Sequence, residues 1–157
     1  KFIGDDFLKY EKYTKELENL GIEVLYGAKY ALGWQGWVKE NAEYIDTVVL
    51  SRPHISQKYI DFIKEHTRAK ILYYIHDLHF LREAREFELT KDPKIKESSE
   101  YCKNVELGIM KKSDVVVTFS ADEKKIIDEH FHSEHAKNVY NYYATGGEDS
   151  TAAVVTR

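Results

Sequence analysis

Short apolar runs alternate along this chain with stretches in which apolar residues recur every three or four positions. The short runs are rich in Val, Ile, Phe and Tyr, which is typical of β-strands, whereas the three-to-four spacing is typical of helices. Strand and helix patterns that alternate in this way predict parallel strands joined by crossover helices. We therefore expect an α/β protein. The predicted strands are residues 1–4, 22–26, 47–50, 70–75 and 114–119, with a weaker sixth at 138–140.

The predicted helices lie between these strands. In the first, Tyr10, Tyr13, Leu17 and Leu20 share one face, and Gly21 ends the helix. Further helices are expected at residues 56–66, 79–88 and 94–112, and a Gly-punctuated segment with Trp34 and Trp37 precedes a short helix that ends near residue 44.

A capping box marks the start of the last predicted helix. Ser120 is followed three residues later by Glu123, so the serine side chain is expected to accept from the backbone of the first turn. The helix then buries Ile126, Ile127 and Phe131. This boundary is the best defined in the chain.

Length and pattern together predict one compact unit. The 157 residues are typical of one domain, and we assign residues 1–143 to a Rossmann-like, doubly wound, mostly parallel sheet with helices on both faces. Residues 144–157 are rich in Thr, Gly and Ser and are expected to form a flexible tail or linker. Because the pattern begins inside a strand, we expect the first part of the sheet to be missing.

Composition narrows the function classes. The chain is 43% hydrophobic and 32% charged, which excludes collagen-like and mostly disordered proteins. Its net charge of −4 gives no overall attraction to nucleic acid. The sequence shows no transmembrane run, and its single cysteine forms no internal disulfide, so the expected location is the cytoplasm.

Ligands of open α/β sheets bind beyond the carboxyl ends of the strands, so the residues that follow each strand are candidates for a site. Arg52 and His54 follow the third strand, and His76, Asp77 and His79 follow the fourth. Arginine suits carboxylate or phosphate groups, and a His–Asp pair suits hydroxyl binding or proton exchange. An ordinary turn with a helix cap explains either cluster equally well at this stage.

Two other constellations are better explained by structure than by chemistry. Metal binding would need His76 with His79, or His130 with His132 and His135, but the second group lies at a helix end, where positive charge complements the helix dipole. Cys102 lies on a predicted apolar helix face with Ile95, Val105 and Ile109, where cysteine behaves as a small hydrophobic residue. Neither a metal nor a cofactor is expected, and glycine-rich nucleotide-binding motifs are absent from the sequence.

Three segments, taken together and in this order, resemble a known family. Residues 46–54 (DTVVLSRPH), 75–86 (IHDLHFLREARE) and 113–123 (SDVVVTFSADE) resemble the N-terminal domain of GT-B-fold, family 4-like glycosyltransferases. The resemblance extends over residues 1–140, and the His-Asp-Leu-His-Phe-Leu-Arg stretch is its most specific part.

The resemblance implies an acceptor-side domain of a retaining glycosyltransferase that uses a nucleotide-sugar donor, with a glycan or lipid-linked molecule as acceptor, in surface polysaccharide biosynthesis. It also implies a second domain that binds the donor, so this chain is expected to be inactive alone. Contact with the inner face of a membrane is compatible with this interpretation. The resemblance implies that His76 and Asp77 are catalytic and that the substrate contacts are Arg52, His54, His79 and Arg82.

Two other functions remain open. A stand-alone binding or interaction module could use the same fold without transfer chemistry. A sugar-nucleotide epimerase of similar fold ranks last, since it would need more carboxylates than the sequence places near the site.

Overall fold

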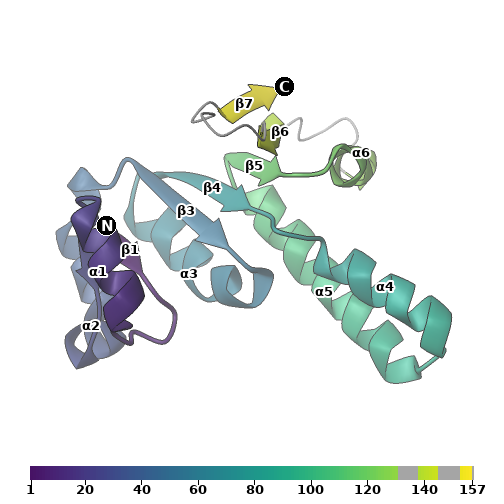
Figure 1. The fold of residues 1–157 in the computed structure, drawn as a ribbon, viewed down its shortest axis with the longest axis horizontal. Helices are drawn as coiled ribbons and strands as arrows, with labels where there is room; N and C mark the ends of the chain where they lie inside the picture. The colour runs from purple at the N-terminus through teal and green to yellow at the C-terminus, as the bar shows by residue number, and fades with distance from the viewer. Residues whose placement is uncertain (131–137, 145–152, 157) are drawn as a thin grey trace. The chain divides into compact units, whose positions relative to one another are not determined.

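The computed structural model describes residues 1–130, 138–144 and 153–156 (Figure 1). Strands alternate with helices along the chain, which confirms the predicted α/β class. The strands are β1 (Phe2–Ile3), β2 (Val24–Leu25), β3 (Thr47–Ser51), β4 (Lys70–Tyr74), β5 (Val115–Thr118), β6 (Asn138–Ala144) and β7 (Ala153–Thr156). The helices are α1 (Glu11–Asn19), α2 (Ala28–Glu40), α3 (Pro53–His66), α4 (His79–Thr90), α5 (Pro93–Lys112) and α6 (Ala121–His130), with a 3-10 turn, η1, at Ala42–Tyr44.

The strands form two sheets. One is the parallel pair β1–β2, and the other has five strands in the order β3-β4-β5-β6-β7. Strands β3 to β6 are mutually parallel, as predicted, whereas β7 runs antiparallel to β6. Part of the segment expected to be a tail thus pairs as a strand, and residues 145–152 and 157 lie outside the described residues.

The chain divides into two compact units where its length predicts one. The first comprises residues 1–45 and 62–68, and the second comprises residues 46–61 and 69–157. Chain length limits the number of compact units only loosely, because it carries no information on which segments pack together.

In the first unit, the sequence predicts the end of helix α1 correctly but not its buried face. Gly21 ends α1 with a left-handed φ of 77°, as predicted, and the Ile22 amide donates to the Leu17 carbonyl across it. Tyr10 and Tyr13 are exposed, however, and Thr14 is the buried residue of α1, so the predicted apolar face of this helix is wrong.

Helix α2 is longer than the glycines suggested. It includes Gly33 and Gly36, which each cost about 1 kcal/mol relative to alanine. Packing offsets this cost, since Trp34 meets the Phe62 ring edge-on with centroids 5.0 Å apart. Tertiary contact therefore outweighs local propensity here.

The two faces of the large sheet differ in burial. Val48 and Leu50 of β3 point to the same face as Ile71 and Tyr73 of β4, and the last three are buried. On the opposite face Val49 of β3 is 62% exposed, although Val117 of β5 is buried there. Fully burying such a side chain contributes about 1.5–3 kcal/mol, so the first face forms the core.

The connections explain this asymmetry. Because β3, β4, β5 and β6 are adjacent in sequence order, right-handed crossovers place α3, the α4–α5 hairpin and α6 on one face. The helices that connect these strands do not supply the second helical layer that the prediction of helices on both faces requires. No helix in the described residues is long and apolar enough to cross a membrane.

Candidate functional site

The candidate residues gather at the carboxyl ends of β3 and β4. These strands pair so that Ser51 is opposite Tyr74, and the segments that follow them start at the same sheet edge. The rings of His54 and His79 stack with centroids 6.4 Å apart and an interplanar angle of 28°. The structure therefore brings together one residue from each predicted cluster.

Asp77 lies between the side chains of His79 and Arg82. Its Oδ1 is 3.3 Å from His79 Nε2, and its Oδ2 accepts from Arg82 Nη1 at 2.5 Å. Both carboxylate oxygens are thus already engaged. Asp77 is placed to hold His79 and Arg82 in position rather than to take a proton from a substrate.

His79 is mostly buried, with its side chain 15% exposed. Burial lowers the pKa of His79, and this effect exceeds the opposing attraction of Asp77. At neutral pH the ring is therefore uncharged. A proton on Nε2 is favoured by the nearby Asp77 oxygen, which leaves Nδ1 as a hydrogen-bond acceptor.

His76 occupies the predicted sheet edge and is exposed. Its ring meets the Tyr74 ring edge-on, with centroids 5.0 Å apart. The Tyr74 ring also meets the ring of Phe119, the residue after β5, with centroids 4.9 Å apart. His76 is thus accessible to a ligand, and its ring packs against Tyr74.

Arg52 has an unusual backbone at the start of α3. Its φ is 66°, in the left-handed region that a residue with a side chain seldom adopts. Its carbonyl accepts from the Ile55 and Ser56 amides, so it acts as the cap of α3. This conformation leaves the Arg52 side chain exposed at the strand end, as the sequence predicted.

Two carboxylates that the sequence analysis did not assign to the site bind its backbone. Glu106 of α5 is 0% exposed and accepts from the His79 and Phe80 amides at 3.1 and 3.0 Å. Glu123 of α6 accepts from the Leu78 amide at 3.2 Å. The sequence did contain a signal for Glu106. This residue lies one helical turn from Cys102 and Ile109, on the predicted apolar face of α5, where a charged residue is unexpected.

Only one of the two hydrogen bonds of the capping box is present. The Glu123 amide donates to Ser120 Oγ at 3.3 Å, as predicted. The Glu123 side chain does not return to the cap, because it binds Leu78 and accepts from Thr118 Oγ1 at 2.7 Å. Its carboxylate thus serves the candidate site instead of its own helix.

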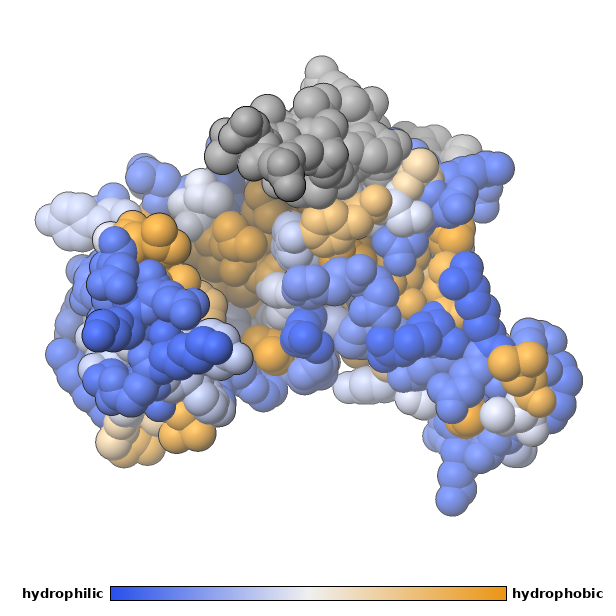
Figure 2. Space-filling view, viewed as in Figure 1, coloured by the Kyte–Doolittle hydropathy of each residue, from blue (hydrophilic) through white to orange (hydrophobic). Residues whose placement is uncertain are grey.

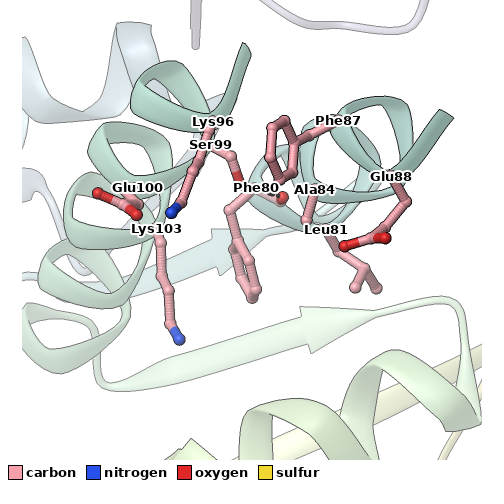
Figure 3. Close-up of a pocket in the computed structure, with 9 residues that line it drawn as sticks. All are labelled: Phe80, Leu81, Ala84, Phe87, Glu88, Lys96, Ser99, Glu100 and Lys103. Carbon is pink, nitrogen blue, oxygen red and sulfur yellow. Dashed lines mark hydrogen bonds between the residues drawn. The ribbon is translucent and has the colours of Figure 1, made fainter. Parts of the chain in front are cut away.

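The α4–α5 hairpin carries a pocket of about 360 Å³ that begins at Phe80, next to His79 (Figure 3). Phe80, Leu81, Ala84 and Phe87 supply its apolar side from α4. From α5, the Lys103 ammonium lies 5.8 Å from the Phe80 ring centre and that of Lys96 lies 6.0 Å from the Phe87 ring centre. Glu88 and Glu100 also line the pocket, so it combines aromatic surface with charges of both signs.

Exposed apolar residues continue along this hairpin. Leu89 is 87% exposed and Tyr101 is 62% exposed. Figure 2 shows apolar residues among charged ones at the outer end of the hairpin.

Metal-ligating side chains do not gather in groups of three within the described residues. His130 Nδ1 lies 2.8 Å from the Ile126 carbonyl, in the last turn of α6. His132, His135 and Phe131 lie outside the described residues. Cys102 is half-buried, and its thiol contacts Glu83 Oε1 at 3.6 Å.

Comparison with known protein families, curated proteins and solved structures gave no match to this chain.

Proposed function

We propose that this chain is the acceptor-side domain of a GT-B-fold, family 4-like retaining glycosyltransferase, which transfers a sugar from a nucleotide-sugar donor to an acceptor hydroxyl. The observation that carries the proposal is the stacking of His54 on His79, which joins the residues after two adjacent parallel strands into one polar edge. Ligands of open α/β sheets bind at such edges. The proposal also requires a doubly wound sheet, and therefore a helical layer on the second face that the connections between β3 and β6 do not supply.

His76 is the proposed contact to the reacting sugar. It is the exposed imidazole at the end of β4, and it carries both a donor and an acceptor for sugar hydroxyls. Arg52 and His54 form the β3 side of the same edge. In this proposal Asp77 is a positioning residue, because its oxygens are engaged by His79 and Arg82.

His79 is proposed to accept a hydrogen bond from an acceptor hydroxyl. Its lowered pKa keeps the ring neutral, and Asp77 favours the tautomer in which Nδ1 is the acceptor. A neutral imidazole can bind a hydroxyl proton, whereas an imidazolium cannot.

The departing diphosphate needs positive charge. Arg82 is already paired with Asp77, which leaves Arg52 as the arginine of this edge without a carboxylate at salt-bridge distance in the described residues. The proposal therefore assigns most of the charge for the leaving group to a donor-binding domain beyond this sequence.

The hairpin pocket favours a lipid-linked acceptor over a free glycan. Its aromatic wall begins one residue after His79, and two lysines stand over its rings. The aromatic part of this surface fits an apolar chain, and the charges of Lys96, Lys103, Glu88 and Glu100 surround it. The proposed reaction would then take place in the cytoplasm, at the inner face of a membrane.

The test uses the natural full-length protein that contains this sequence. Release of nucleoside diphosphate is measured with a panel of nucleotide sugars and with glycan and lipid-linked acceptors. His76→Ala is expected to lower turnover on the order of 10²-fold, the scale of losing one positioned catalytic group, without changing the melting temperature.

Lys125→Ala is the control, because Lys125 is an exposed residue of α6. Its turnover should equal that of the wild type. Unchanged turnover in a stably folded His76→Ala protein would reject the role of His76, and absence of transfer with every donor would reject the proposed function.

A binding module without transfer chemistry is the second candidate. The observation in its favour is that both oxygens of Asp77 are engaged, so the edge has no open carboxylate at this position. Saturable binding of a glycan without release of nucleoside diphosphate would support this alternative.

A further inference from the structure

Three successive amides at the start of α4 bind carboxylates from other helices. Leu78 donates to Glu123 Oε1, His79 to Glu106 Oε1 and Phe80 to Glu106 Oε2, at 3.2, 3.1 and 3.0 Å. Glu106 and Glu123 follow this turn by about 26 and 45 residues. The contacts are therefore tertiary, and they act on the residues that follow His76 and Asp77.

Helix α4 lacks a side-chain cap of its own. Its cap residue is Leu78, whose side chain has no hydrogen-bonding group, and the first amides of a helix have no partner inside the helix. Glu106 supplies the missing acceptors, and in its ionised form it also places negative charge at the positive end of the helix dipole. A fully buried carboxylate is costly unless it is bonded in this way.

Glu123 extends the contact to the next strand. Its Oε2 accepts from the hydroxyl of Thr118, the last residue of β5, which is fully buried. One carboxylate thus connects the carboxyl end of β5 with the turn after β4. Ser99 adds a further bond on the α5 side, from its hydroxyl to the Phe80 carbonyl at 2.8 Å.

We propose that Glu106 and Glu123 are positioning residues, which fix the turn of residues 76–80 and so hold the His79 ring against His54 at the ligand-binding edge. The identity of the ligand at that edge rests on the proposed function. The positioning role does not, and it is tested without a substrate.

The two glutamates differ in how they tolerate a change to glutamine. A glutamine at 106 offers one oxygen to two amides, so one amide would face the side-chain NH2 group and lose its acceptor. A glutamine at 123 keeps both contacts, since its oxygen can accept from Leu78 and its NH2 can donate to the Thr118 hydroxyl. The same substitution should therefore loosen the turn at one position and preserve it at the other.

The experiment is NMR spectroscopy of the isotope-labelled chain. In the wild type, the Leu78, His79 and Phe80 amides should exchange with solvent at least 10²-fold more slowly than in an unstructured peptide, and the His54 and His79 rings should show a mutual NOE. If these three amides exchange with solvent as fast as those of an unstructured peptide, the proposal is overturned. This measurement needs no variant.

Glu106→Gln should accelerate exchange at His79 and Phe80 at least tenfold and weaken the ring NOE, whereas Glu123→Gln should resemble the wild type. Glu97→Gln, an exposed position on the same helix, controls for the loss of charge. If Glu106→Gln does not fold, Glu123→Ala is used, and it should accelerate exchange at Leu78. Native exchange and an intact NOE in Glu106→Gln, or in Glu123→Ala where that is used, would reject the positioning role. If the chain passes these tests but the natural full-length protein transfers no sugar, only the proposed function is rejected.

Discussion

His54 and His79 stack with ring centroids 6.4 Å apart, although they belong to different helices that start after different strands. The contact forms because β3 and β4 are parallel and adjacent, so the chain leaves both strands at the same edge. Polar residues from two sequence clusters thereby share one surface. The following predictions test the packing and the electrostatics around it.

Because Val116 is buried and Val49 is exposed, a valine-to-alanine substitution should lower the free energy of unfolding by different amounts at the two positions. Val116→Ala removes a side chain that is 1% exposed and should lower the free energy of unfolding by about 2 kcal/mol. Val49→Ala changes a side chain that is 62% exposed and should cost about 0.5 kcal/mol or less. Urea unfolding measures both, and equal losses would contradict the assignment of the buried face.

Glu106 should make the protein less stable as pH rises. The pKa of Glu106 is raised from 4.5 to about 7, chiefly by burial and also by the charges of Asp77 and Glu83, against two backbone hydrogen bonds that lower it. The folded state therefore binds more protons than the unfolded state between pH 4.5 and 7, and stability falls across this range, in total by on the order of 3 kcal/mol.

The measurement is urea unfolding of the wild type and Glu106→Gln at several pH values. The difference in unfolding free energy, wild type minus variant, should decrease between pH 4.5 and 7 because glutamine does not titrate. The other titratable groups that interact with Glu106, Tyr73 and Cys102, are present in both proteins. A constant difference would show that Glu106 titrates alike in the folded and unfolded states.

His79 should have the opposite effect. Burial lowers the pKa of His79 below its ordinary value of 6.5, so the folded state binds fewer protons than the unfolded state once the pH falls below about 6.5. The stability of the wild type should decrease with falling pH in this window relative to His79→Gln. The NMR titration of the His79 ring gives the folded pKa directly, and a value at or above 6.5 would contradict the burial of the ring.

Cys102 should react slowly with thiol reagents. Burial raises the pKa of the Cys102 thiol, and the neighbouring Glu83 raises it further by charge and hydrogen bonding. Labelling with iodoacetamide at pH 8 should be at least tenfold slower in the folded chain than in urea. Glu83→Gln should speed up labelling of the folded chain, since it removes the charge that opposes thiolate formation, and an unchanged rate would exclude this influence.

The strand–helix alternation and most element boundaries could be predicted from the sequence, because hydrophobic periodicity and stop signals are local. Gly21 ends α1, and Ser120 caps α6, as their residue types predict. Local signals also misled: the glycines of α2 suggested a broken segment, and Tyr10 and Tyr13 suggested a buried face, because burial depends on which element packs against the helix.

The candidate residues Arg52, His54, His76, Asp77 and His79 could likewise be placed at strand ends by the sequence alone, since the residue after a buried strand must lie at the edge of the sheet. Only the tertiary structure decided how they meet. In the structure, the Asp77 carboxylate contacts His79 and Arg82. Glu106 and Glu123 accept hydrogen bonds from the amides at the start of α4. These contacts join residues far apart in the chain, and their energies depend on burial and on hydrogen-bond geometry, which no local pattern contains.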